Sequence, residues 1–180
     1  MSDALDTALA HFEIQQAIYR YCRALDRLDA QLLTSAFHPE AHIDLGAIYR
    51  GGVSGFVPVA MAFMGEMLVT RHDVSNIMIE SLEDGYGCEA YVQAWHRLVT
   101  PEGEQELLVM PRYLCRFARH EGAWRIIHHA EVVDWGRLGP TSAAWYESNT
   151  ELPKGVRNRA DSSYRILGSQ GESGVVRAES

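Results

Sequence analysis

The sequence predicts a single α+β domain in which N-terminal helices pack against a curved antiparallel sheet, followed by an irregular C-terminal tail. Two observations carry this prediction. Apolar residues near the N-terminus recur at a three-four spacing, which is typical of an amphipathic helix. From His72 onward, apolar and polar residues alternate in long segments separated by short glycine-containing turns, which is typical of a strand meander. Helices that precede such a meander indicate an α+β domain, and its sheet can curve into a half-open cone.

The N-terminal half is expected to hold three helices and one strand. The first helix should span about residues 5–29, because its apolar side chains fall on one stripe. At about 100° per residue, Asp26 lies on the flank of that stripe, where its carboxylate can face either solvent or a cavity. Helices are also expected over residues 30–37 and 56–68, and a strand over 41–45. The stripe of the first helix comprises Ile14, Ile18, Tyr21, Cys22, Leu25 and Leu28.

The second half is expected to hold four long strands, and the short turns between them make neighbours antiparallel. We therefore expect one domain over residues 1–138 and a C-terminal extension over 139–180. The extension should be partly disordered, because residues 169–180 are rich in glycine, serine and glutamate. Aromatic residues such as Tyr164 indicate that its earlier part packs somewhere. The strands are expected over residues 72–82, 86–100, 106–119 and 123–137.

The charge and composition of the chain limit which classes of partner it can bind. The chain of 180 residues carries a formal net charge of −8, so a nucleic-acid partner, which needs a basic stripe, is not expected. The longest basic cluster, residues 154–159, holds three cations in a polar segment and is expected to be a solvated loop. No apolar run reaches membrane-spanning length, so no membrane partner is expected.

The cysteines indicate the compartment. Cys22, Cys88 and Cys115 are an odd number without paired spacing, and each lies among apolar neighbours, where a free cysteine behaves as a small hydrophobe. The start of the chain is acidic where a signal peptide needs cations. We therefore expect a reduced, cytoplasmic protein.

Asp26 and His72 form the most informative pair. A histidine that meets a carboxylate across a pocket can abstract a proton near neutral pH, with the carboxylate fixing the tautomer of the ring. Taken singly, each residue has an ordinary alternative, since Asp26 can be a solvated charge near a helix end and His72 can lie at the surface. The pair is a candidate because both can reach the floor of the cone.

Other polar residues have two interpretations each. Tyr21 is either a core tyrosine or a donor in the pocket. His128 and His129 must face opposite sides of a strand, so at most one looks into the cone. Arg112 is either a buried partner of an anion or an edge arginine whose stem covers apolar surface.

Flexible and aromatic side chains suit the wall of a pocket for an irregular apolar ligand, although the same residues also suit a core. No metal site is expected, because His38 and His42 are separated by Pro39 and share no helical face. The seven candidates for substrate contact are Phe56, Met64, Leu68, Met78, Trp95, Met110 and Arg112.

Several short segments resemble the SnoaL-like branch of the nuclear transport factor 2-like superfamily. The likeness covers roughly residues 8–137 and implies a cystatin-like α+β barrel. It is carried by residues 18–26 (Ile-Tyr-Arg-Tyr-Cys-Arg-Ala-Leu-Asp), 37–41 (Phe-His-Pro-Glu-Ala), 70–76, 112–117 and 124–126.

The resemblance implies particular roles. Enzymes of this superfamily include scytalone dehydratase, bile acid 7α-dehydratase and hexachlorocyclohexane dehydrochlorinase; they need no metal or organic cofactor, and several use a His–Asp dyad placed like His72 and Asp26. Tyr21 matches the spacing of a tyrosine in the bile acid enzyme. An arginine on the last strand of related enzymes is replaced here, with His129 the closer match, and histidine can donate a proton whereas arginine mainly offers fixed charge.

The expected function is that of a cofactor-independent lyase acting on a hydrophobic, aromatic small molecule, by loss of water, hydrogen halide or formaldehyde. The resemblance also implies a homo-oligomer, a dimer or trimer. An isomerase or cyclase with the same base is a close variant. The competing interpretation is the non-catalytic small subunit of a ring-hydroxylating dioxygenase, which has this fold.

Overall fold

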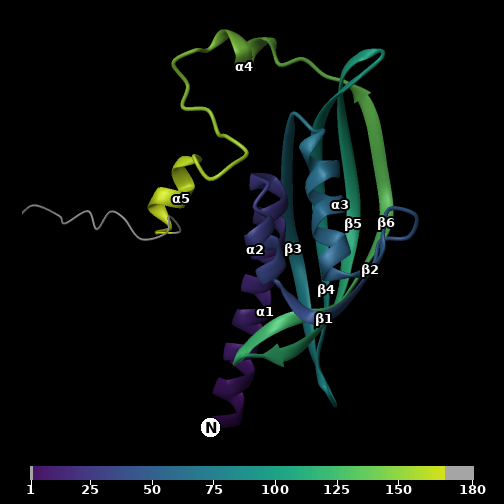
Figure 1. The fold of residues 1–180 in the computed structure, drawn as a ribbon, viewed down its shortest axis with the longest axis vertical. Coiled ribbons are helices and arrows are strands. Elements are labelled where there is room, and N and C mark those ends of the chain that lie inside the picture. The colour runs from purple at the N-terminus through teal and green to yellow at the C-terminus, as the bar shows by residue number, and fades with distance from the viewer. Residues whose placement is uncertain (1, 169–180) are drawn as a thin grey trace, which may run out of the picture.

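A six-stranded curved sheet forms the body of the protein, and the three N-terminal helices pack against it (Figure 1). The structure is a computed structural model and describes residues 2–168, with side chains from residue 4 on. The helices are α1 (Ser2–Arg27), α2 (Ala30–Ser35), α3 (Val53–Gly65), α4 (Ala144–Ser148) and α5 (Ser162–Ile166). The strands are β1 (Phe37–Asp44), β2 (Arg50–Gly52), β3 (Val69–Leu82), β4 (Gly85–Thr100), β5 (Gly103–His120) and β6 (Ala123–Pro140).

The sheet is mixed, which corrects the expectation of a purely antiparallel one. Its order is β2-β1-β6-β5-β4-β3, and β3 to β6 form the predicted antiparallel meander. β1, however, pairs with β6 in parallel, with Ile43 opposite His129. The direction of this pairing is not fixed by a turn, because residues 45–122 separate the two strands. The α+β class and the curved, unclosed sheet are confirmed.

Several element ends differ from the prediction. α3 begins at Val53, directly after its N-cap Gly52, so it starts and ends about three residues earlier than its apolar pattern predicts. β3 begins at Val69, so Thr70 and His72 both lie within the strand. The intrinsic preference of residues for helix or strand predicts the ends of these elements poorly. For β3, the hydrogen bonds to the neighbouring strand decide where it begins.

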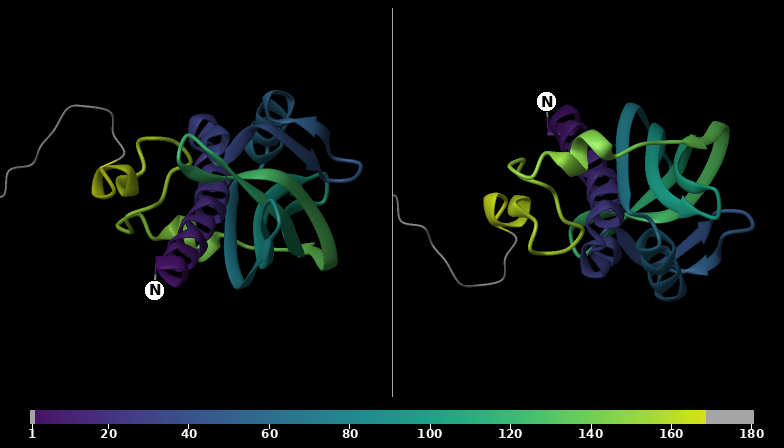
Figure 2. Two further views of the ribbon diagram at one scale, coloured as in Figure 1. Left: turned by 90° about the horizontal axis from the view of Figure 1, so that it is seen from below. Right: turned by 90° about the horizontal axis from the view of Figure 1, so that it is seen from above.

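The sheet bends where the register between neighbouring strands shifts. The register of β3 against β4 shifts after Ser75, and Asn76 has a φ of +47°, a conformation that asparagine adopts more readily than most residues. A second shift lies at Pro111 in β5, which has no backbone N–H to donate. Such bulges bend a strand, so the sheet wraps around a hollow, and α1 and α3 lie along the side that stays open (Figure 2).

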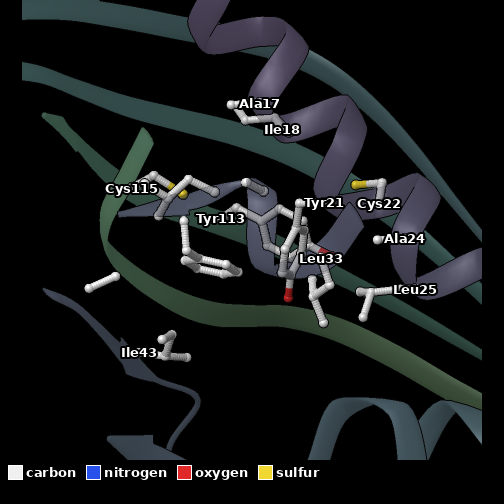
Figure 3. Close-up of a cluster of buried hydrophobic side chains, with 14 of the residues drawn as sticks. Ala17, Ile18, Tyr21, Cys22, Ala24, Leu25, Leu33, Ile43, Tyr113 and Cys115 are labelled. Carbon is white, nitrogen blue, oxygen red and sulfur yellow. The ribbon is translucent and has the colours of Figure 1, made fainter. Parts of the chain in front are cut away.

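The core lies between α1 and the sheet. The apolar stripe of α1 is buried as expected, with Ile14, Ile18 and Leu25 almost fully excluded from solvent. Figure 3 shows Tyr21 of α1 beside Tyr113 of β5, and their rings meet edge to face with centroids 5.4 Å apart. This packing fixes the last two turns of α1 over the sheet, and so fixes the position of Asp26.

The C-terminal extension leaves β6, crosses one end of the fold and continues beside α1 (Figures 1 and 2). Its anchor is Tyr164, which is 2% exposed and donates a hydrogen bond to Asp29 Oδ2 at 2.7 Å. The Arg159 guanidinium also pairs with Asp29, at 3.1 Å. The expected disorder of residues 169–180 lies outside the described residues. Across residues 2–168, no helix has both the length and the apolar character needed to cross a membrane.

Candidate functional site

Asp26 and His72 meet at the junction of α1 and β3. The Nδ1 atom of His72 lies 2.7 Å from Asp26 Oδ1, and the backbone N–H of His72 donates to Asp26 Oδ2 at 3.1 Å. The His72 side chain is 3% exposed and that of Asp26 is 14% exposed. Both carboxylate oxygens of Asp26 thus bind the same residue, which holds the imidazole in one orientation.

This geometry assigns the tautomer of His72. A carboxylate only accepts hydrogen bonds, so Nδ1 of His72 carries the proton that faces Asp26. In the neutral ring, Nε2 then keeps a free lone pair. The arrangement can therefore take up a proton at Nε2 and stabilise the resulting imidazolium through Asp26.

A second layer of hydrogen bonds holds Asp26 itself. The hydroxyl of Thr70, which is 4% exposed, donates to Asp26 Oδ1 at 2.9 Å. Arg157, from the C-terminal extension, donates to the Thr70 hydroxyl and to the backbone carbonyls of Met64 and Met67 at the end of α3. Residues 154–159 form a loop that is exposed apart from Arg157, as expected, but Arg157 and Arg159 are both bound to the body of the protein.

A cavity of about 270 Å³ opens beside His72 on the concave side of the sheet. Apolar side chains of α3 and of β4 to β6 make most of its wall, which suits an apolar ligand. An engineered cavity of about 150 Å³ holds benzene, so the volume here suits a molecule of one or two rings. The apolar lining comprises Leu25, Leu45, Ile48, Phe56, Val59, Ala60, Phe63, Met64, Ala94, Leu107, Val109 and Val133.

Five polar or titratable side chains also line this cavity: Tyr21, His72, His96, Tyr113 and Glu131. Burial raises the pKa of both tyrosine hydroxyls well above their usual value, with the charge of Glu131 adding to it. Burial also raises the pKa of the Glu131 carboxyl. These residues can present hydrogen-bond donors to a ligand that His72 contacts.

His96 packs edge to face against His72, with ring centroids 5.4 Å apart. Burial, followed by the charge of His72, lowers the pKa of His96 to about 4. The ring of His96 is therefore neutral at neutral pH, so it does not compete with His72 as a cation in this cavity.

The structure brings part of the predicted site together. Tyr21, Phe56 and Met64 line the cavity with His72. Leu68 and Trp95 line a different, more open cleft of about 440 Å³, which reaches the dyad through Asp26.

The remaining predicted contacts lie elsewhere. Arg112 bridges Glu89 and Asp134 in an ion-pair network, with N–O distances of 2.8 Å, and Met78 is 58% exposed. Met110 lies at the register shift of β5 and lines neither the cavity nor the open cleft. The sequence left open whether Arg112 binds an anion or covers apolar surface at a sheet edge. In the structure it binds two carboxylates of the protein itself, those of Glu89 and Asp134.

His129 lies behind the cavity wall instead of in it. Its ring is completely buried, packs against Tyr21 and Tyr113 at centroid distances of 4.9 and 5.1 Å, and has Nδ1 3.2 Å from Cys115 Sγ. Burial lowers its pKa to about 3, so the ring is neutral. His128 faces the other side of the strand and stacks on His42.

Sequence reasoning missed Glu131, Thr70, His96 and Arg157 as parts of the site. Glu131 is two residues beyond His129 and therefore faces the same side of β6, which is a signal that strand alternation offered. Arg157 gave no such signal, because its partners are more than 85 residues away in sequence. Within residues 2–168, no group of three or more His, Cys, Asp or Glu side chains is placed to hold a metal ion.

Comparison with known proteins connects this geometry to a family. A family model described as a SnoaL-like domain matches residues 6–130, which confirms the resemblance. Uncharacterised proteins of Mycobacterium tuberculosis and Mycobacterium bovis are 29% identical over 125 residues, covering 67% of this chain and 82% of theirs.

Solved structures share the fold. A type 2 hexachlorocyclohexane dehydrochlorinase has a TM-score of 0.70 at 20% identity and covers 77% of this chain and 95% of its own. A scytalone dehydratase-like protein of Novosphingobium aromaticivorans has a TM-score of 0.64 at 18% identity, with 79% and 94% covered. A cystatin-like protein of Nostoc punctiforme has a TM-score of 0.55 at 20% identity, with 71% and 92% covered. At these identities the likeness shows the fold alone.

Proposed function

The chain belongs to the SnoaL-like domain family, and from this premise we propose that it is a lyase that works without a metal or organic cofactor on a small hydrophobic, aromatic molecule. The observation that carries the proposal is the contact of 2.7 Å between His72 Nδ1 and Asp26 Oδ1 at the edge of an apolar cavity. Two of the solved structures with this fold are named for eliminations, of water and of hydrogen chloride.

The proposed reaction begins with His72. Its Nε2 takes a proton from a carbon atom of the substrate, and the electron pair of that C–H bond forms a double bond as the leaving group departs. Asp26 holds the ring and stabilises the imidazolium. A well-placed general base contributes about 10²–10⁴-fold to the rate.

The cavity supports this chemistry because most of its lining is apolar. A dry wall strengthens the interaction between the imidazolium and Asp26 and protects a reactive intermediate from side reactions. Tyr21 can donate a hydrogen bond to the substrate, but its raised pKa makes it a weak acid. The cavity volume of about 270 Å³ favours a substrate of one or two rings.

Two variants remain within the proposal. The same dyad could deprotonate a substrate hydroxyl and break a carbon–carbon bond in a retro-aldol step with loss of formaldehyde or another aldehyde, or it could move a proton in an isomerisation. We further propose a homo-oligomer, since apolar side chains such as Tyr91 and Val132 remain exposed on the sheet.

A turnover assay with the purified full chain tests the proposal. The substrate is the aldol adduct of benzaldehyde and acetone, offered without added metal beside the same molecule with chloride in place of the hydroxyl. Mass spectrometry distinguishes water loss from cleavage back to benzaldehyde, and His72→Ala is assayed alongside. Product formation that depends on His72 supports the lyase. Turnover that persists in His72→Ala would remove His72 from the mechanism and overturn the proposed base. Silence together with co-purification of a larger iron–sulfur protein would favour the structural-subunit interpretation.

A further inference from the structure

We propose that Glu131 is the catalytic acid of this site, which protonates a leaving hydroxyl group, and that the substrate is accordingly a β-hydroxy carbonyl compound of one or two rings. The inference rests on the proposed lyase function and adds to it the bond that breaks, C–O, and the residue that supplies the second proton. It starts from a carboxyl group that lines the same cavity as His72.

Among the described residues that line this cavity, Glu131 carries the one carboxyl group. It lies on β6 and projects into the cavity between Val133 and Tyr113. Glu131 is half-buried, and within residues 2–168 its carboxyl has no hydrogen bond and no ion pair, whereas the other titratable groups of the dyad region are held by protein partners. A carboxyl group that lines a mainly apolar cavity and has no partner in the protein is available to a polar group of a ligand.

The ionisation of Glu131 suits an acid. Burial raises the pKa of its carboxyl, and His72 is the charged neighbour that opposes this effect. The other titratable groups that face it are the hydroxyls of Tyr21 and Tyr113, which are neutral at neutral pH. Glu131 therefore keeps its proton to a higher pH than a solvated glutamate does.

His72 and Glu131 face the same cavity from different strands, so they can act on neighbouring atoms of one bound substrate. His72 lies on β3 and Glu131 on β6, and these strands are three positions apart in the sheet. At about 4.8 Å between neighbouring strands, their backbones would be about 14 Å apart across a flat sheet. The curvature of the sheet turns both side chains into the same cavity. A ring system bound against Phe56 and Met64 can thus present a C–H bond to His72 and an oxygen to Glu131.

The other candidates for the leaving-group donor fit less well. His129 is completely buried behind Tyr21 and Tyr113, and its neutral ring does not reach the cavity. His96 is also neutral, with a pKa lowered to about 4, so at neutral pH it lacks the acidic proton of an imidazolium ring. Tyrosine is a much weaker acid than a carboxyl group.

The step balances. His72 takes the proton from the carbon next to the carbonyl, the C–H electron pair becomes the new carbon–carbon double bond, and the C–O bond breaks. The departing oxygen takes the proton of Glu131 and leaves as water. Transfer of the proton from the imidazolium to the Glu131 carboxylate through solvent restores both groups. A halide leaves without a proton, so Glu131 has no such part in the loss of hydrogen halide.

The turnover test compares two leaving groups in the full chain. Glu131→Gln keeps the shape and can still donate a hydrogen bond, but it cannot give up a proton. We expect Glu131→Gln to lower water loss from the benzaldehyde–acetone adduct by at least about 100-fold, and to leave the loss of chloride from the matched chloride within about threefold. An equal fall in both reactions, or no fall in water loss, would overturn the proposal, because a structural role affects both leaving groups alike.

A binding test decides the role of Glu131 even if neither compound is turned over. Indanol and methylindane match in shape and differ in one hydroxyl group. By calorimetry we expect the wild-type chain to prefer indanol by roughly tenfold, Glu131→Gln to keep the preference, and Glu131→Leu to lose it. A preference that survives in Glu131→Leu, or no preference in the wild-type chain, would contradict the assignment. Circular dichroism establishes that each variant is folded. The absence of turnover in both wild-type reactions would count against the lyase alone.

Discussion

The Arg157 guanidinium donates a hydrogen bond of 3.2 Å to the hydroxyl of Thr70, and that hydroxyl in turn donates to Asp26. The C-terminal extension is thereby connected to the dyad through two hydrogen bonds. Arg157 also binds the carbonyls of Met64 and Met67 at the end of α3, so one side chain joins α1, α3 and β3. Arg157 lies beyond residues 6–130, which are those matched to the SnoaL-like family.

Arg157→Ala is expected to lower the free energy of unfolding by about 2–4 kcal/mol, because it leaves buried carbonyls without their donor. Arg157→Lys should recover only a small part, since an ammonium group cannot reach the same set of oxygens as a guanidinium. Chemical denaturation measures both. Arg137→Ala is the matched control, because its pair with Glu106 is exposed and worth less than about 1 kcal/mol. Equal losses for Arg157→Ala and Arg137→Ala would show that the contact does not stabilise the junction.

Asp26→Asn is expected to lower turnover of the substrate found for the wild-type chain by at least about 100-fold, as is His72→Ala, while the thermal midpoint changes little. The amide in Asp26→Asn can no longer stabilise a charged imidazole ring. Steady-state kinetics on purified variants measures the effect. Asp73→Asn serves as the control, because Asp73 pairs with Arg71 at the surface, one residue from His72. Near-normal kcat in either dyad variant would remove that residue from the mechanism.

Ala94→Leu is expected to block ligand binding without unfolding the protein. Ala94 is 4% exposed and lines the cavity, so an isobutyl group in place of its methyl group fills space that a ligand would take. Repacking into an existing cavity costs less than insertion into a close-packed core, where the cost is about 1–3 kcal/mol. Calorimetry with indanol measures binding, and Ala90→Leu, in the buried core beside Tyr113, is the comparison that should lose stability instead. Unchanged indanol binding in Ala94→Leu would mean that ligands bind elsewhere.

The pH dependence of stability should include a contribution from His96. Its folded pKa of about 4 lies below the usual value of 6.5, so only the unfolded chain takes up the proton as pH falls between these values. The stabilisation is fully present above pH 6.5 and is lost progressively down to about pH 4. His96→Gln should therefore flatten the fall in this window, by roughly 1–3 kcal/mol. Denaturation at several pH values measures it, with the exposed His42→Gln as the control. A parallel fall in His96→Gln and the wild-type chain would contradict the assignment.

The thiols are expected to be unreactive in the folded protein. Cys22, Cys88 and Cys115 are each less than 10% exposed, and burial raises their pKa values, that of Cys88 to about 12. The thiolate is the reactive form, so an aromatic disulfide reagent should label them only after denaturant is added. Rapid labelling of the native protein would show that the core opens locally around these residues.

Much of the fold could be predicted from local patterns. The stripe of α1 and the alternation in β3 to β6 report burial on one face, which is a property of each segment by itself. The same alternation indicated that His128 and His129 face opposite sides. It left open which of the two faces inward, because that depends on the parallel pairing of β6 with β1.

The candidate site was less accessible to such reasoning. The likeness to a known family directed attention to Asp26 and His72, which are 46 residues apart and meet only because α1 packs over β3. Of the candidates for substrate contact, Phe56 and Met64 line the cavity beside His72. Met78, Arg112 and His129 lie elsewhere because bulges in the strands and the curvature of the sheet change which positions face the hollow.

The sequence by itself therefore determined the class of the fold, the polarity of each helix and strand, and the residue types available for proton transfer. The tertiary structure decided which of those residues share a cavity, that Glu131 faces it, and that Arg157 closes the junction behind Asp26. The physical reason is the range of the interactions. Hydrophobic periodicity acts between neighbours in the chain, whereas the contacts that make a site join segments far apart in sequence and exist only after the sheet has curved and the core has packed.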